Sequence, residues 1–167
     1  PPRSTLFPYT TLSDLHIVVR VGEKANSVVA QDLRGPVGLA LAAPDAVYVS
    51  ENTSGTLTRV DLKTGSKREM AADLQHPEGL ALMKDGRLAI AEAGARRLVA
   101  IDLHTQQRSI LASDLPPPVA ALRTPSPVGM PTGVAVGRDG AIYISSDGDN
   151  SIRKIVVAAQ KQKRKTK

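Results

Sequence analysis

The chain has 167 residues, of which 41% are hydrophobic and 2% aromatic, and it contains no cysteine and no tryptophan. A chain of this length can bury one sizeable core. The lack of cysteine excludes a disulfide framework and a thiolate metal site, and no apolar run reaches the length of a membrane span. We therefore expect a globular protein that makes no membrane contact.

The first dozen residues, PPRSTLFPYTTL, match no other part of the chain. They resemble translated sequencing-adapter read-through at the end of an assembled gene, and a natural, poorly ordered N-terminus is the alternative. We expect residues 1–15 to form a non-native or disordered segment. This end supports no inference about targeting, so secreted, periplasmic and cytoplasmic locations all stay open.

A motif of 18 residues occurs three times further along the chain. The copies begin at Gly35 (GPVGLALAAPDAVYVSEN), His76 (HPEGLALMKDGRLAIAEA) and Met130 (MPTGVAVGRDGAIYISSD). Gly38 and Gly79 are 41 residues apart, and the same step separates three Asp-Leu pairs, which begin at Asp32, Asp73 and Asp114. A repeat of about 40 residues with several short strands is typical of a propeller blade.

One repeat, residues 75–115, shows the strands of such a blade. Its apolar segments are short, alternate with polar turns and lack helical periodicity, which predicts β-strands. The predicted strands cover 79–82, 88–91, 98–101 and 108–112. Asp85-Gly86 lies between the first two strands, and Asp139-Gly140 is its equivalent in the last repeat; Asp-Gly is a typical hairpin turn.

The repeats predict an all-β fold, a β-propeller of four-stranded antiparallel blades, with 13 strands or about three blades in this chain. Residues 17–33 match only the third and fourth strands, and 131–157 match the first three. The predicted parts are a partial propeller over 16–157, with a half-blade at 16–33, blades at 34–74, 75–115 and 130–157, and a proline-rich insertion at 116–129. An open arc leaves strand edges unpaired, so we expect a fragment of a ring or a homodimer that completes one.

The net charge of +6 is concentrated at the C-terminus. Five positive side chains lie within residues 158–167, which leaves +1 for the remainder of the chain. The repeats therefore carry no basic stripe, and the tail has no aromatic side chain to stack on a base. We expect a solvated, disordered tail and no nucleic-acid partner.

The segments PEGLALMKDGRLAIAE and PTGVAVGRDGAIYISSD resemble blades of the NHL and SMP-30/gluconolactonase superfamily, to which strictosidine-synthase-like proteins are related. The resemblance covers about residues 17–157 and implies a six-bladed ring with a polar pocket at one end of its axis. In gluconolactonase-like members, the resemblance further implies a divalent cation, usually calcium, in that pocket and the opening of sugar lactones.

Candidate site residues follow from the antiparallel order of the strands. The start of the first strand and the end of the second lie at the same face of a blade. A hard cation such as calcium takes 6–8 oxygen ligands, and a carboxylate can act as general base for a metal-bound water. We predict Glu78 as metal ligand and catalytic base, and the predicted ligand-binding residues are Glu51, Asn52, His76, Glu92 and Asp147.

Structural explanations compete with each of these roles. Glu51 and Glu92 occupy matching positions of two repeats, so each is expected to bond the next hairpin's backbone N–H if its role is structural. Lactonase-like blades place metal-binding Asn and catalytic Asp directly before the first-strand glycine, and the matching residues here are Val37, Glu78 and Thr132. Only one of these three binds a cation strongly.

The leading hypothesis is a propeller that binds a small-molecule substrate and is a metal-dependent sugar-lactone hydrolase. The alternative is a non-catalytic NHL-repeat-like module that binds another protein. A quinone-dependent sugar dehydrogenase is a third interpretation, but it requires a basic catalytic residue and cation-binding loops, and the sequence offers no such set.

Overall fold

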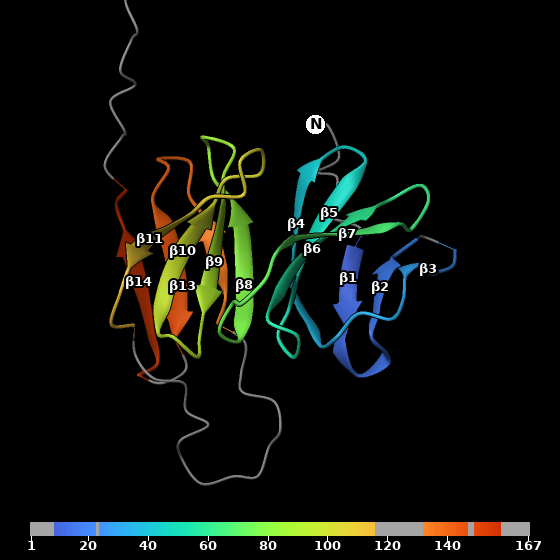
Figure 1. Ribbon diagram of the computed structural model, residues 1–167, viewed down its shortest axis with the longest axis horizontal. Helices are drawn as coiled ribbons and strands as arrows, with labels where there is room; N and C mark the ends of the chain where they lie inside the picture. Colours follow the sequence, from blue (N-terminus) through green and yellow to red (C-terminus); the bar gives the residue numbers. More distant parts are fainter. Residues whose placement is uncertain (1–8, 23, 116–131, 147–148, 158–167) are drawn as a thin grey trace, which may run out of the picture.

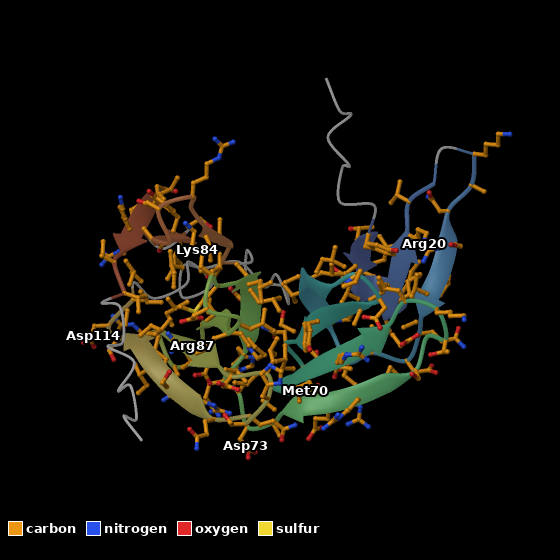
Figure 2. All side chains as sticks on the ribbon, turned by 90° about the horizontal axis from the view of Figure 1, so that it is seen from above. Arg20, Met70, Asp73, Lys84, Arg87 and Asp114 are labelled. Atoms are coloured by element: carbon orange, nitrogen blue, oxygen red, sulfur yellow. The ribbon has the colours of Figure 1, made fainter. Side chains whose placement is uncertain are left out.

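The computed structural model describes residues 9–22, 24–115, 132–146 and 149–157. Over these residues the chain forms fourteen strands in four antiparallel sheets, together with one short 3-10 helix (Figure 1). Seen from above, the sheets fan around a common centre in an open arc, with Arg20 and Lys84 on opposite arms (Figure 2). Among the described residues, no helix is long and apolar enough to cross a bilayer.

Each sheet is a meander of consecutive strands, and we number the sheets as blades 1 to 4. Blade 1 contains β1 (Tyr9–Leu12), β2 (Ile17–Arg20) and β3 (Ser27–Ala30), with η1 (Ser13–Leu15) between its first two strands. Blade 2 contains β4 (Pro36–Ala43), β5 (Ala46–Glu51), β6 (Thr56–Asp61) and β7 (Lys67–Ala71). Blade 3 contains β8 (Pro77–Leu82), β9 (Leu88–Glu92), β10 (Arg97–Ile101) and β11 (Arg108–Ala112). Blade 4 contains β12 (Val134–Val136), β13 (Ile142–Ser146) and β14 (Ser151–Ile155).

The N-terminal segment differs from the expectation. Residues 1–15 were predicted as a non-native or disordered segment, but residues 9–15 are ordered, because β1 pairs with β2 along its whole length and η1 follows it. The Thr11 hydroxyl donates to the Val37 carbonyl at 3.1 Å, which joins β1 to blade 2. Blade 1 therefore has three strands where two were predicted. The predictions for the insertion 116–129 and the tail 158–167 lie outside the described residues.

The Asp-Leu pairs of the sequence connect successive blades. Each aspartate has a left-handed backbone, with φ of 58°, 56° and 58° along the chain. This turn brings the amide of the following leucine onto the connection that leads into the next-to-last strand of the blade just completed. The three bonds run from Leu33 N to His16 O, from Leu74 N to Gly55 O and from Leu115 N to Arg96 O, at 3.1, 2.9 and 2.9 Å. The leucine side chains are buried, so each pair fixes one blade to the next.

The innermost strands of neighbouring blades pass so closely that glycine is required there. A Cβ on Gly38 would lie 2.3 Å from the Glu78 carbonyl oxygen, and one on Gly79 would lie 2.2 Å from the Thr132 carbonyl oxygen. The Gly79 amide donates to that Thr132 oxygen at 2.9 Å. The repeated glycine is therefore explained by contact between adjacent blades.

The hydrophobic core lies between the blades rather than in one central cluster. One cluster joins blades 1 and 2, a second joins blades 2 and 3, and a third joins blades 3 and 4. The second strands β5 and β9 are buried along their whole length, because each lies inside the arc with a blade on both sides. Burial of one such leucine or isoleucine contributes about 1.5–3 kcal/mol.

Candidate functional site

Five of the six predicted site residues lie at one face of the arc. Pro36 at the start of β4 is opposite Glu51 at the end of β5, and Pro77 at the start of β8 is opposite Glu92 at the end of β9. We call this end of blades 2 and 3 the strand-start face. It carries Glu51, Asn52, His76, Glu78 and Glu92, whereas Asp147 lies outside the described residues.

Glu51 is bonded on both carboxylate oxygens. The Arg34 amide donates to Oε2 at 2.5 Å, and the Thr58 hydroxyl donates to Oε1. Only 6% of the residue is exposed. Its carboxylate therefore holds the turn that leads into its own blade, which is a structural role, although the N–H that it accepts belongs to this preceding turn and not to the next hairpin.

Glu92, the equivalent residue of blade 3, makes the same backbone contact with different side-chain partners. The Gln75 amide donates to Oε1 at 2.9 Å, and Arg97 donates from Nε to Oε2 at 2.5 Å and from Nη2 to Oε1 at 3.2 Å. Arg108 adds a second cation 3.8 Å away. Glu92 is fully buried, and its hydrogen bonds raise the pKa of Arg97. The predicted ligand-binding carboxylate is thus the centre of an internal ion cluster.

Glu78 joins blade 3 to blade 4 and blade 2. Its Oε2 accepts a hydrogen bond from the Thr132 amide at 2.5 Å, at the approach to β12. Its backbone carbonyl accepts from the Ser50 hydroxyl at 2.5 Å, on β5. Only 6% of Glu78 is exposed. These contacts belong to the junction between blades, and none of them indicates a catalytic base.

Asn52 and His76 are the two predicted residues whose side chains the structure brings together. The His76 Nδ1 lies 3.3 Å from the Asn52 Oδ1, and the Asn52 Nδ2 donates to the Pro77 carbonyl at 3.4 Å. Asn52 follows β5 and His76 precedes β8, so the pair bridges blades 2 and 3. Because His76 is exposed, the pair is accessible to a ligand, in contrast to the buried carboxylates beside it.

The turn that carries His76 is shaped to hold its ring. In blade 2 the equivalent position is Gly35, and the Thr53 side chain lies where a Gly35 Cβ would be. In blade 3 the large and the small residue are exchanged, because His76 is at the first position and Gly94 at the second. A Cβ added to Gly94 would lie 2.8 Å from the His76 Cδ2. Sequence reasoning missed Gly94, although the aligned repeats contain this reciprocal change from Gly and Thr to His and Gly.

The described residues do not fit the predicted calcium site. Calcium requires six to eight oxygen ligands. Over the described ranges, no group of three or more His, Asp and Glu side chains could hold a metal ion. Directly before the first-strand glycines, Val37 offers no side-chain donor, and the Glu78 Oε2 already accepts the Thr132 amide.

Comparison with known proteins supports the fold but does not identify the chemistry. No family model matches the chain, and no curated protein matches it in sequence. Virginiamycin B lyase from Staphylococcus aureus is similar in structure, with 13% identity and a TM-score of 0.62 over 89% of this chain and 51% of that one. A gluconolactonase from Xanthomonas campestris has 16% identity and a TM-score of 0.59 over 87% of this chain and 46% of that one.

A chain of a nidogen/laminin complex is also similar, with 18% identity and a TM-score of 0.57 over 87% of this chain and 60% of that one. The chain has a β-propeller fold. The fold that the sequence motifs predicted is therefore confirmed, and it is shared with a lyase, a gluconolactonase and a chain of a nidogen/laminin complex. This propeller chain spans about half the length of the two enzyme structures.

Proposed function

We propose that this propeller binds a small polyhydroxylated molecule at the strand-start face, through Asn52 and His76. The observation that supports this function most strongly is the exposed Asn52–His76 pair at the junction of two blades. The neighbouring carboxylates are engaged in holding the turns, whereas the histidine ring is an accessible polar group at this junction. The chain supplies one part of the binding surface of a larger ring.

Sugar lactones are the ligand class to test first. One structurally similar protein is a gluconolactonase, and another is a lyase crystallised as a catalytically inactive histidine-to-alanine variant with quinupristin. Hydrolysis of a lactone requires a base that activates water. In this chain the exposed His76 ring is better placed for that role than Glu78, whose Oε2 accepts the Thr132 amide.

A non-catalytic interaction module is the second candidate, and the outermost strands favour it. Val28 on β3 and Ile110 on β11 occupy equivalent positions and are 56% and 58% exposed. The equivalent residue of blade 2 is Glu69, which is charged. Apolar side chains exposed on outer strands are suited to contact with another protein. This role uses the rim of the arc and leaves the strand-start face unused.

A ligand titration separates the two functions. The full chain, labelled with 15N, is titrated with glucono-1,5-lactone while backbone amide shifts are recorded, and the His76→Ala variant is compared with His104→Ala. His104 is an exposed histidine of another turn and serves as the matched control. We expect shifts around residues 52 and 76 that His76→Ala removes and His104→Ala retains. Absence of those shifts in the wild type at millimolar lactone overturns the proposal.

A further inference from the structure

We infer that Asn52 fixes the ring proton of His76 on Nδ1, so that the unprotonated Nε2 is presented to the ligand as a hydrogen-bond acceptor. This inference rests on the proposed function, because it names the atom by which the same site recognises its ligand. It assigns Asn52 as a positioning residue and His76 as the residue that contacts the ligand.

The orientation of the Asn52 amide comes from the Pro77 carbonyl. A carbonyl oxygen only accepts hydrogen bonds, so the amide nitrogen of Asn52 must face it, and the separation of Nδ2 from that oxygen is 3.4 Å. The amide oxygen then faces the His76 ring, 3.3 Å from Nδ1. A reversed amide would place its oxygen against the Pro77 carbonyl oxygen and lose that bond, although its nitrogen could then donate to an unprotonated Nδ1.

The proton on the His76 ring follows from that orientation. An amide oxygen only accepts, so the Nδ1 of His76 must donate and must therefore carry the proton. A neutral imidazole has one N–H, and the hydrogen bond made by one nitrogen determines the state of the other. Nε2 is then left with its lone pair free to accept a hydrogen bond.

The backbone of His76 is in a conformation that favours glycine. Its φ of 46° is left-handed, at the position where blade 2 has Gly35 with a φ of 64°. A left-handed backbone costs free energy in a residue with a side chain, and such residues cluster at functional sites. Gly94 leaves room for the ring on the other side. The ring is thus held between Asn52 of blade 2 and Gly94 of blade 3.

The bare Nε2 selects the chemistry of the ligand. A lone pair accepts from a hydroxyl or an N–H group, whereas a phosphate would place acceptor oxygens against it. The ligand class that fits is a neutral molecule with hydroxyl groups, such as a sugar lactone or polyol. A ligand hydroxyl bonded to Nε2 is also correctly placed to give up a proton to it.

Nitrogen NMR of the ring tests this inference without any ligand. The full chain is labelled with 15N-histidine and studied at about pH 8, where free imidazole is neutral. We expect the His76 Nδ1 to give the shift of a protonated nitrogen and Nε2 that of a bare one. Asn52→Ala should remove this preference, and Asn52→Asp, which keeps an acceptor oxygen, should retain it. His104 is the internal control, with signals unchanged in both variants.

A proton on Nε2 of His76 in the wild type overturns the inference, and so does a tautomer that Asn52→Ala leaves unchanged. Titration of the same sample with glucono-1,5-lactone and with inorganic phosphate separates this result from the proposed function. If lactone causes shifts but the ring proton is on Nε2, the proposed function is supported and the inference about the tautomer is contradicted. The expected tautomer without any lactone shift removes the function, and phosphate shifts as large as the lactone shifts overturn the acceptor role.

Discussion

Blades 2 and 3 have the same backbone arrangement, but the side chains at the junction between them differ. Equivalent residues are 41 positions apart, the same bulge occurs at Leu57 and Leu98, and equivalent glycines contact the next blade. The pair Gly35 and Thr53 of blade 2 is replaced by His76 and Gly94 in blade 3. The shared positions hold the blades together, and the position that differs presents an exposed ring.

The two buried carboxylates show the same division. Glu51 and Glu92 each accept the amide of the turn that enters their blade, whereas their other partners are a hydroxyl in blade 2 and two guanidinium groups in blade 3. The position is maintained for its backbone contact, and the remaining partners vary. A repeated acidic residue in a propeller is therefore weak support for a metal site.

The largest effect is expected where the blades touch. Gly79→Ala should lower the free energy of unfolding by about 3 kcal/mol, because the new Cβ would lie 2.2 Å from a backbone oxygen that cannot move alone. Gly133→Ala is the matched control, since its nearest atom is the Ser145 Oγ at 3.0 Å, and its cost should be below about 1 kcal/mol. Urea unfolding measures both, and equal costs would show that the close approach is wrong.

The carboxylate at the centre of the ion cluster comes next. Glu92→Ala should cost about 2–3 kcal/mol, because it leaves the Gln75 amide unpaired and Arg97 without its partner, although Arg97 is 28% exposed. The double variant Glu92→Ala/Arg97→Ala should be less damaging than the sum of the single variants. Urea unfolding of the four proteins gives the coupling, and strict additivity would contradict the ion pair.

The hydroxyl that joins blades 2 and 3 should have a smaller effect. Ser50→Ala removes the donor to the Glu78 carbonyl and the acceptor of the Gly38 amide, which should cost about 1–2 kcal/mol at this buried site. Ser145→Ala, at the equivalent and more exposed position of blade 4, should cost less than about 0.5 kcal/mol. Thermal unfolding compares the stabilities of the two variants. A larger loss of stability for Ser145→Ala would contradict the conclusion that Ser50 makes the stronger contact.

The smallest effect concerns the exposed turns at the ends of β6 and β10. Backbone hydrogen bonds from Thr64 to Asp61 and from Thr105 to Asp102 lower the pKa of each carboxyl below its ordinary value of 3.8. A lowered folded-state pKa stabilises the fold above the unfolded value, and this contribution is lost as the pH falls through the folded value. The double variant Asp61→Asn/Asp102→Asn should therefore lose less stability than the wild type between about pH 5 and pH 3. Urea midpoints at both pH values measure this, and identical pH dependence would contradict it.

The sequence predicted the frame well because the frame repeats. The Asp85-Gly86 and Asp139-Gly140 turns form as predicted, with left-handed glycines in both. The opposition of Pro36 with Glu51 and of Pro77 with Glu92 also follows from antiparallel order alone. Local turn chemistry and alternation are sufficient for these features.

The site was less predictable because contacts between blades decide it. Glu78 lies in the expected place, but its partner Thr132 is 54 residues away and no local pattern shows that bond. Likewise, nothing near Asn52 in the sequence indicates that it meets His76, which is 24 residues away. The strand at Tyr9–Leu12 was missed because it is not similar to the repeats. A homodimer and a ring of six blades stay predictions.

Transfer of the blade 2 turn into blade 3 tests the central claim most directly. The double variant His76→Gly/Gly94→Thr gives blade 3 a glycine and a threonine at these two positions. Blade 2 already has this pair, Gly35 and Thr53, at the equivalent turn. The measurement is its free energy of unfolding in urea. If His76 is kept for a ligand and the frame does not need it, the value should lie within about 1 kcal/mol of the wild type or above it, since a strained left-handed residue is removed. A loss of more than about 2 kcal/mol would show that His76 stabilises the blade junction, and would contradict its role as the ligand-facing residue.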